Sequence, residues 1–458
     1  MNNNVQISIA AIIAELRSST NLDSQEYKDF FVSVFFVLFI LIHRRELLKQ
    51  DSLFVSELVQ TLGDEVFFSK LLKAATHVDE LYDDALGLSE TIEHLITRGR
   101  EINSAAFRRA CISLYGVVSD SELYCGDTFE AIIQFFSEMQ GRRASEAYTP
   151  RDLVEMMVEI VEPRGGEIIY DPVCGSGGFL VSANIKASNI DADSKLKTYG
   201  REINLSAARI AKINCIVHDI FGSDIRISDS LQDLEVSAYD IILANPPFSL
   251  ATESYGRRVS DSYFDFGIPP QNNADFAFLQ MIIKSLKPEG RAAVLVSNGV
   301  LFRGGIEGVI REKIIQSGIV EAVIALPGGA LKNTMIPTAI LVLRKSRLPK
   351  SPILLIDSAE AERHVNTGLA SSLGLPFSST LEKYKKLIEV DGVSRFVTAD
   401  ELESNSYSLN VSRYIIARQA HKKSLSDLTK TQRELEVRLA TLQRDFSHLL
   451  SEHKIGTQ

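Results

Sequence analysis

The segment Asn245-Pro246-Pro247-Phe248 constrains the fold of this chain more than any other stretch. It follows a short apolar run, residues 239–244, that is typical of a buried β-strand. Two consecutive prolines cannot continue a central strand, because proline has no backbone N–H for the sheet. We therefore expect the chain to leave the sheet at Asn245, at the carboxyl end of a strand. Open α/β sheets bind their ligands at that edge.

This turn offers the groups that would capture a planar base bearing an exocyclic amine. Asn245 supplies an amide acceptor, Pro246 a rigid carbonyl and Phe248 a flat aromatic face. A proline-rich turn with a phenylalanine in the core is the alternative, and these residues alone do not separate the two interpretations.

A second motif upstream predicts a ligand-binding turn. Residues 168–171 read as a strand, the glycine-rich segment 172–178 follows, and an apolar helical pattern begins at Phe179. This order is the usual nucleotide-binding start of a doubly wound sheet. Glycines let the backbone approach a ligand closely, and the first N–H groups of the helix can hold a carboxylate. The spacing is not that of dinucleotide-binding proteins, and no phosphate-binding Gly-Lys-Ser/Thr occurs.

Two acidic residues follow the next two strand-like runs. Glu202 comes after residues 197–199, and Asp229 comes after residues 225–227, with a helical stretch between them. Acids at the ends of successive parallel strands line one edge of a sheet. Glu202 could accept hydrogen bonds from a ribose diol, and Asp229 from the amine of an adenine. Both could equally be exposed caps of the strand ends.

Together these motifs resemble the Rossmann-like methyltransferases that use S-adenosylmethionine. More narrowly, they resemble the modification subunits of type I restriction–modification systems, which are adenine-N6 DNA methyltransferases of the N-6 DNA methylase family. The segments that carry the resemblance are residues 147–151 (Ala-Tyr-Thr-Pro-Arg), 171–180, 245–248, 267–278 and 407–414.

The resemblance implies a fold, a cofactor and a set of site residues. The expected fold is an α/β methyltransferase domain with a reversed last strand, an N-terminal helical domain and a long C-terminal coiled-coil helix. The expected cofactor is S-adenosylmethionine, and no metal is implied. The implied catalytic residues are Asn245, Pro246, Pro247 and Phe248. The implied cofactor-binding residues are Tyr148, Thr149, Asp171, Gly175, Ser176, Gly177, Glu202, Asp229 and Ser230.

The resemblance also implies how these residues act. An adenine inside a duplex is out of reach, so the base must be flipped into a pocket. The Asn245 oxygen and the Pro246 carbonyl would accept the two N–H bonds of its amine, and Phe248 would stack on the ring. Gly175 and Gly177 would admit the methionine part of the cofactor.

Composition indicates the cellular setting and the partners. The four cysteines have no paired spacing, which predicts reduced thiols in a cytoplasm and neither disulfides nor a zinc site. Cys174 in the glycine turn reads as a packing residue. The net charge of −10 is unfavourable for binding duplex DNA alone. The chain also lacks room for a sizeable DNA-reading domain. We therefore expect a specificity subunit to supply most DNA contacts, together with a restriction subunit and a second copy of this chain.

Three parts are expected along the chain: a helical domain at 1–145, the catalytic domain at 146–417 and a heptad helix at 418–458. The apolar run 30–42 is too short to span a bilayer and predicts a buried helix. The polar segment 249–272 predicts either a DNA-facing lid or simple disorder. The heptad leucines predict a helix that pairs with another helix, the alternative being a helix packed on its own domain. These leucines are Leu428, Leu435, Leu442 and Leu449.

Two other functions remain open at this stage. Protein glutamine methyltransferases also use Asn-Pro-Pro followed by an aromatic residue on this fold, typically tyrosine. The heptad tail and residues 267–278 argue against that class. A scaffold that keeps the fold but binds no cofactor is the other alternative, although every motif residue needed for chemistry is present.

Overall fold

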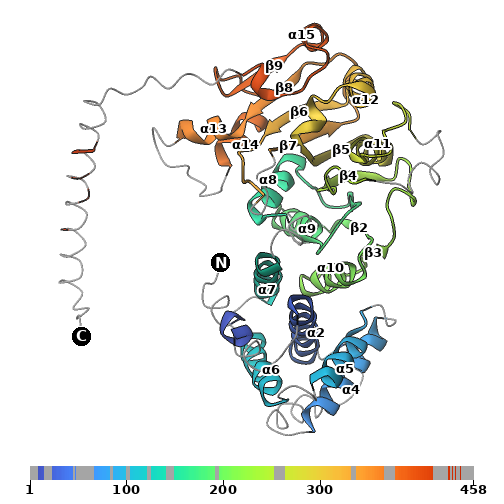
Figure 1. Cartoon of the computed structure of the whole chain (residues 1–458), viewed down its shortest axis with the longest axis vertical. Helices are drawn as coiled ribbons and strands as arrows, with labels where there is room; N and C mark the ends of the chain where they lie inside the picture. Colours follow the sequence, from blue (N-terminus) through green and yellow to red (C-terminus); the bar gives the residue numbers. More distant parts are fainter. Residues whose placement is uncertain are drawn as a thin grey trace. The chain divides into compact units, whose positions relative to one another are not determined.

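A computed structural model gives the structure of the chain (Figure 1). The residues that it describes are 9–14, 23–44, 47, 66–82, 86–99, 104–120, 125–140, 149–190, 195–251, 264–331, 337–365, 377–415, 432, 433, 436, 439 and 444. The chain divides into two compact units, Met1–Ile415 and Ile416–Gln458. The three-part division expected from the sequence stays a prediction.

The N-terminal part of the first unit is helical, as expected. Its described helices are α2 (Ser24–His43), α4 (Phe67–Leu81), α5 (Leu88–Gly99), α6 (Ser104–Ser119) and α7 (Cys125–Gln140). Helix α2 begins at a capping box, in which Asp23 accepts hydrogen bonds from the helix start and Glu26 accepts one from the Asp23 N–H. Residues 30–41 of α2 are all buried, so the predicted buried helix is confirmed.

The remainder of the first unit is a twisted sheet with helices on both faces. The described strands form one nine-stranded sheet of order β3-β2-β1-β4-β5-β7-β6-β8-β9. The strands are β1 (Ile168–Asp171), β2 (Lys197–Glu202), β3 (Asp224–Ile227), β4 (Tyr239–Ala244), β5 (Leu286–Ser297), β6 (Val320–Ala325), β7 (Thr338–Arg344), β8 (Ile353–Asp357) and β9 (Ser394–Val397). Strand β7 runs antiparallel between β5 and β6 and is the reversed strand that the resemblance implies.

Two apolar cores, one on each face, hold the sheet between its helices. One core contains buried residues of α8 (Arg151–Val161), α9 (Gly178–Ile190) and α10 (Leu205–Val217). The other contains buried residues of α11 (Asp275–Ser285) and α12 (Gly305–Gln316). The predicted α/β methyltransferase fold is confirmed in this arrangement. None of the described helices is both long and apolar enough to cross a membrane.

The helical part packs on the sheet domain through α10. The fully buried side chain of Asn214 on α10 donates a hydrogen bond to Glu130 of α7, with 2.7 Å between Nδ2 and Oε1. At the other end of α10, the Ser206 hydroxyl donates to Asp29 of α2 at 3.0 Å. The two parts therefore share polar contacts at both ends of one helix.

The start of β5 does not follow the local sequence pattern. Residues 287–290 (Lys-Pro-Glu-Gly) are typical of the end of a helix, and the apolar strand-like run begins at Ala292. The strand instead starts at Leu286, which pairs with Tyr239, and regular pairing resumes at Arg291 opposite Ile241. The intervening residues bulge out of the ladder, which accommodates Pro288 because a bulged residue needs no ladder donor.

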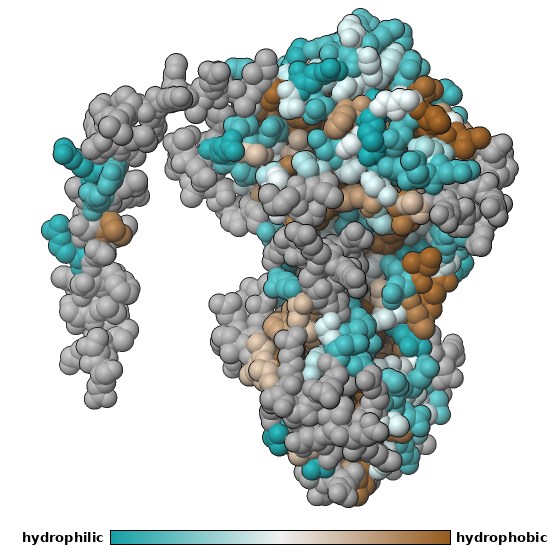
Figure 2. All heavy atoms as spheres, viewed as in Figure 1, coloured by the Kyte–Doolittle hydropathy of each residue, from teal (hydrophilic) through white to brown (hydrophobic). Residues whose placement is uncertain are grey.

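Three further features lie outside the sequence motifs. Strands β8 and β9 and helices α13 (Ser358–Val365), α14 (Ser378–Lys385) and α15 (Ala399–Ser404) extend the domain beyond what the motifs predicted. Residues 252–263 of the predicted lid and all four heptad leucines lie outside the described residues. On the face that Figure 2 shows, the described residues form a mainly hydrophilic surface with a few hydrophobic patches.

Candidate functional site

A cavity of about 540 Å³ lies at the carboxyl ends of β1, β2, β3 and β4. Pockets of this size suit a ligand of nucleoside dimensions. It brings together most of the predicted site residues. The predicted residues that line it are Thr149, Asp171, Gly175, Ser176, Glu202, Asp229, Ser230, Asn245 and Pro247. Gly177, Pro246 and Phe248 are not among the lining residues, and Tyr148 lies outside the described residues.

The Asn245 side chain has a fixed orientation. Its Nδ2 donates a hydrogen bond to the hydroxyl of Thr149 at 3.1 Å, a contact between residues 96 positions apart. Among the described residues, neither the Asn245 Oδ1 nor the Pro246 carbonyl oxygen accepts a hydrogen bond. Thr149 thus occupies the donor of the amide and leaves its acceptor available to a ligand.

A buried carboxylate holds the chain just after this turn. Asp275, at the start of α11, accepts a hydrogen bond from the Ser249 N–H at 2.8 Å. The same carboxylate accepts from the Ser297 hydroxyl at 3.2 Å and forms an ion pair with Arg303. The Ala274 N–H also donates to the Leu250 carbonyl at 3.0 Å. The turn that contains Asn245 is therefore anchored to α11 and to the end of β5. Sequence reasoning noted this segment but not its role.

The glycine turn and Glu202 are joined directly. Gly175 has a φ of +52°, which glycine adopts without strain, and its N–H donates to the Glu202 carboxylate at 3.0 Å. The other Glu202 oxygen accepts from the Asn204 N–H at 2.8 Å. Glu202 therefore caps the strand end and lines the cavity at the same time, so the two interpretations of this acid are compatible.

Asp171, at the end of β1, is almost fully buried beside the cavity. Burial raises the pKa of its carboxyl to about 8, although a hydrogen bond from the Val173 N–H opposes the shift. At neutral pH this carboxyl is mostly protonated in the free protein.

Gly177 has a different position from the one expected. Its φ is +81°, and a Cβ added there would lie 3.3 Å from the Cβ of Ala211 on α10. The residue therefore lets α9 approach α10 closely and does not border the cavity. Its neighbour Gly178 lines the cavity, and a Cβ added to Gly178 would meet open space.

Asp229 also caps its own turn. Its two carboxylate oxygens accept from the Leu231 N–H at 3.1 Å and from the Gln232 side chain at 2.7 Å. Asp229, Ser230 and Leu231 all line the cavity.

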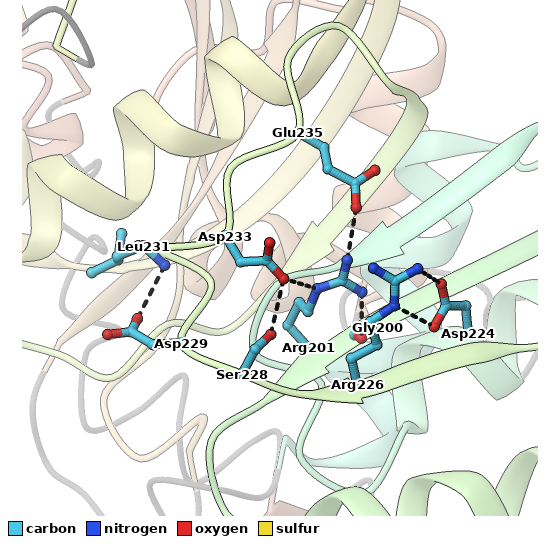
Figure 3. A network of polar contacts seen from close by, with 9 residues as sticks. All are labelled: Gly200, Arg201, Asp224, Arg226, Ser228, Asp229, Leu231, Asp233 and Glu235. Carbon is cyan, nitrogen blue, oxygen red and sulfur yellow. Dashed lines mark hydrogen bonds and ion pairs between the residues drawn. The ribbon is translucent and has the colours of Figure 1, made fainter. Parts of the chain in front are cut away.

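Behind this turn lies Arg201, which the motifs did not single out (Figure 3). It is the largest of the fully buried side chains. Its guanidinium pairs with Asp233 at 3.1 Å and with Glu235 at 2.7 Å. Both partners lie more than 30 positions after Arg201 in the chain, so no local sequence pattern reveals the pairing.

Phe248 is half-buried and packs against the apolar core that contains α8 and α9. Cys174 is buried in the glycine turn, where burial raises the pKa of its thiol well above the usual range. A thiol held neutral is a poor nucleophile, which agrees with a packing role.

The helical part contributes two acids that the sequence did not predict. Asp127 and Glu130 of α7 line the cavity. With Asp171, Glu202 and Asp229 they make five carboxyl groups among the described lining residues, against a single arginine, Arg151. Arg151 is itself paired with Glu155 at 2.8 Å. Because Asp171 is mostly protonated at neutral pH, the other four carboxyl groups supply the acidic character of this lining, which favours a ligand that carries positive charge. No described group of three His, Cys, Asp or Glu residues could hold a metal ion.

Known proteins resemble this chain in sequence and in fold. The type I restriction enzyme MjaIX methylase subunit of Methanocaldococcus jannaschii is 27% identical over 408 residues, covering 81% of this chain and 72% of that protein. The MjaVII methylase subunit of the same organism is 28% identical over 369 residues, covering 76% of this chain but only 63% of that protein. The crystal structure of a type I restriction-modification system methyltransferase subunit from Streptococcus thermophilus shares the fold, with a TM-score of 0.68 at 22% identity. That likeness covers 91% of this chain and all of the other.

The family model of the N-6 DNA methylases matches residues 120–423. This range contains the whole nine-stranded sheet and every residue that lines the cavity. The chain belongs to the N-6 DNA methylase family.

Proposed function

We propose that this chain transfers a methyl group from S-adenosylmethionine to the N6 amine of a flipped adenine in double-stranded DNA. It would act as the modification subunit of a type I restriction–modification complex. The observation that carries the proposal is the Asn245 amide, whose donor is held by Thr149 and whose acceptor remains available beside the cavity.

The residues around the cavity fit the cofactor. The acidic lining complements the ammonium and sulfonium groups of S-adenosylmethionine. Glu202, at the end of β2, would accept hydrogen bonds from the ribose hydroxyls. The turn that contains Asp229 and Ser230 would border the adenine. Gly175 and Gly178 would leave room for the methionine part. Gly178 replaces Gly177 in this proposal, because of these two neighbours Gly178 borders the cavity and Gly177 does not.

The chain's own residues would prepare the target amine. When bound, the cofactor supplies an activated methyl group on a sulfonium. The Asn245 oxygen and the Pro246 carbonyl would accept the two N–H bonds of the adenine amine, which favours a pyramidal nitrogen with a localised lone pair. Positioning of that nitrogen in line with the methyl group would supply much of the rate. Phe248 would stack on the flipped ring, a contact worth about 1–3 kcal/mol.

Partners follow from the same proposal. A specificity subunit would supply most of the contacts to DNA, since this chain carries a net charge of −10. A second copy of this chain and a restriction subunit would complete the complex. A solved structure that concerns complex assembly and conformational transition of the type I R-M system has a TM-score of 0.60 to this chain. That neighbour is 20% identical to this chain, so the likeness shows only that the two share a fold.

The proposal is tested by methyl transfer from labelled cofactor with the specificity subunit present. Duplex DNA should be labelled at adenine N6, and a glutamine-containing protein acceptor should not. Labelling of the protein acceptor alone would support the glutamine methyltransferase. Calorimetry that detects no cofactor binding by the folded chain would support the scaffold.

A further inference from the structure

Arg201 is a buried cation that the proposed chemistry does not use. Its side chain on β2 is fully buried, and a guanidinium cannot lose its charge by deprotonation. Taking such a charge out of water is costly unless it is paired and hydrogen-bonded. The groups that contact Arg201 therefore identify the segments that it holds together.

The contacts of Arg201 reach three neighbouring segments, and Figure 3 shows those with Asp233 and Glu235. Its Nε and a terminal nitrogen bond Asp233 and Glu235, in the segment that leads from β3 to β4. Its Cζ lies 5.9 Å from the ring centre of Tyr170 on β1, and its backbone carbonyl accepts from the Cys174 N–H at 2.9 Å. One residue thus touches β1, the glycine turn and the segment after β3.

The pair with Asp233 connects Arg201 to the cavity wall. The Asp233 oxygen that accepts from Arg201 also accepts from the Ser228 hydroxyl at 3.3 Å. The Asp233 N–H donates to the Asp229 carbonyl at 3.1 Å, which closes the turn. Residues 228–232 of this turn all line the cavity.

We propose that Arg201 is a positioning residue that fixes the turn 228–233, so that this turn can receive the adenosine part of the cofactor. The inference rests on the proposed function, because it takes the bound nucleoside to be that of S-adenosylmethionine. Asp233 and Glu235 remain partly exposed, whereas the guanidinium is not, so the arginine is the member of the network that water cannot replace.

The chain provides a matched control on the neighbouring strand. Arg226 on β3 lies beside Arg201 in the sheet register. It pairs with Asp224 at the surface and does not line the cavity (Figure 3). Arg201→Met and Arg226→Met therefore remove the same group from adjacent positions, one behind the cavity wall and one outside it. Arg201→Lys keeps the charge but loses the planar fork, and Glu235→Gln leaves the pair between Arg201 and Asp233 in place.

The test measures cofactor affinity by calorimetry and methyl transfer by the complete complex. Arg201→Met should raise the Kd for S-adenosylmethionine, and for methylthioadenosine, by about tenfold, which corresponds to about 1.4 kcal/mol. At saturating cofactor kcat should stay within about twofold, because the target site is untouched. Arg201→Lys and Glu235→Gln should show smaller rises, and Arg226→Met none.

Hydrogen exchange supplies a readout that does not depend on the cofactor. Amides 228–233 should exchange faster in Arg201→Met than in Arg226→Met, with the rest of the sheet unchanged. If Arg201→Met does not fold, the exchange rates of Arg201→Lys and Glu235→Gln can be compared with those of Arg226→Met instead. Normal exchange of this turn, or an unchanged Kd, in folded Arg201 variants would overturn the proposal. A wild-type chain that binds no S-adenosylmethionine would instead contradict the proposed function, while the exchange data would still decide whether Arg201 holds the turn.

Discussion

Two neighbouring glycines in the turn before α9 have separate roles. A side chain at Gly177 would meet Ala211 on α10, whereas one at Gly178 would enter open space beside the cavity. Gly178→Leu should therefore raise the Kd for S-adenosylmethionine by about tenfold or more, with little change in Tm. Calorimetry and thermal unfolding check this. Gly116→Leu on α6 is the control, because a Cβ there also meets open space. Wild-type affinity in a folded Gly178→Leu chain would remove this glycine from the site.

The buried carboxyl of Asp171 predicts a pH dependence of cofactor binding. Its pKa is about 8 in the folded chain, against about 3.9 when unfolded, so the free protein retains this proton across neutral pH. A cationic ligand favours the ionised carboxylate, so binding should release the proton. Affinity should then rise by up to about tenfold per pH unit between about pH 6 and 8 and level off above. Asp171→Asn should abolish the dependence, as calorimetry in buffers of different ionisation enthalpy would show. A dependence that persists in Asp171→Asn would exclude this group.

The raised pKa of Asp171 also makes the stability of the folded chain depend on pH. Stability should change with pH in the opposite direction to cofactor affinity. The folded state binds more protons than the unfolded state between about pH 4 and 8, so stability without ligand should fall as pH rises through that range.

Most motif residues were visible in the sequence because they follow recognisable strands, but the contacts that hold them in position were not. Asn245 could be placed at a strand end from the two prolines that follow it. Its partner Thr149, and the anchor Asp275, are set by contacts between distant segments. Gly177 was misplaced because a sequence shows that a glycine is required but not which neighbour requires it.

At the scale of elements, the register of the sheet places the chemistry. The positions of the strands followed from apolar runs bounded by glycine and proline, and the reversed strand β7 followed from the resemblance to methyltransferases. The bulge at the start of β5 did not, because Lys287–Gly290 reads locally as a turn and only pairing with β4 makes it part of a strand. Strands β8 and β9 carry none of the recognised motifs, so nothing in the sequence drew attention to them.

The anchor between the catalytic turn and α11 can be tested by Asp275→Asn. The change weakens the hydrogen bonds to Ser249 and Ser297 and the ion pair with Arg303. Because a displacement of about 1 Å can cost about 100-fold in rate, kcat should fall between about tenfold and 100-fold while the Kd for the cofactor changes little. Asp265→Asn removes an exposed ion pair with Lys284 of the same helix and is the control. Equal losses in both variants would argue against an anchoring role.

For the whole molecule, net charge and the C-terminal unit bear on assembly. The proposed function requires partners to bind DNA, because the chain is acidic, and residues 416–458 form a unit of their own. The expected pairing of the heptad leucines stays a prediction, since those residues lie outside the described part.

Truncation after Ala417 should leave a folded chain that binds the cofactor but no longer assembles or methylates specifically. Leu435→Asp and Leu442→Asp should have the same effect, because each would bury a charge in the helix seam. Light scattering with and without the specificity subunit measures this. Gln443→Asp, outside the heptad seam, is the control. Normal assembly and unchanged methylation sites in the truncated chain would assign the tail to packing on its own domain.

The most direct test of the central claim is adenine methylation by Asn245→Ala in the complete complex. Because the Asn245 oxygen is assigned to the target amine, kcat should fall by about 100-fold or more while the Kd for S-adenosylmethionine stays within about twofold. Asn245→Asp keeps an acceptor oxygen and should retain more activity than the alanine variant. Near wild-type methylation by Asn245→Ala would contradict the assignment of this residue to the target amine.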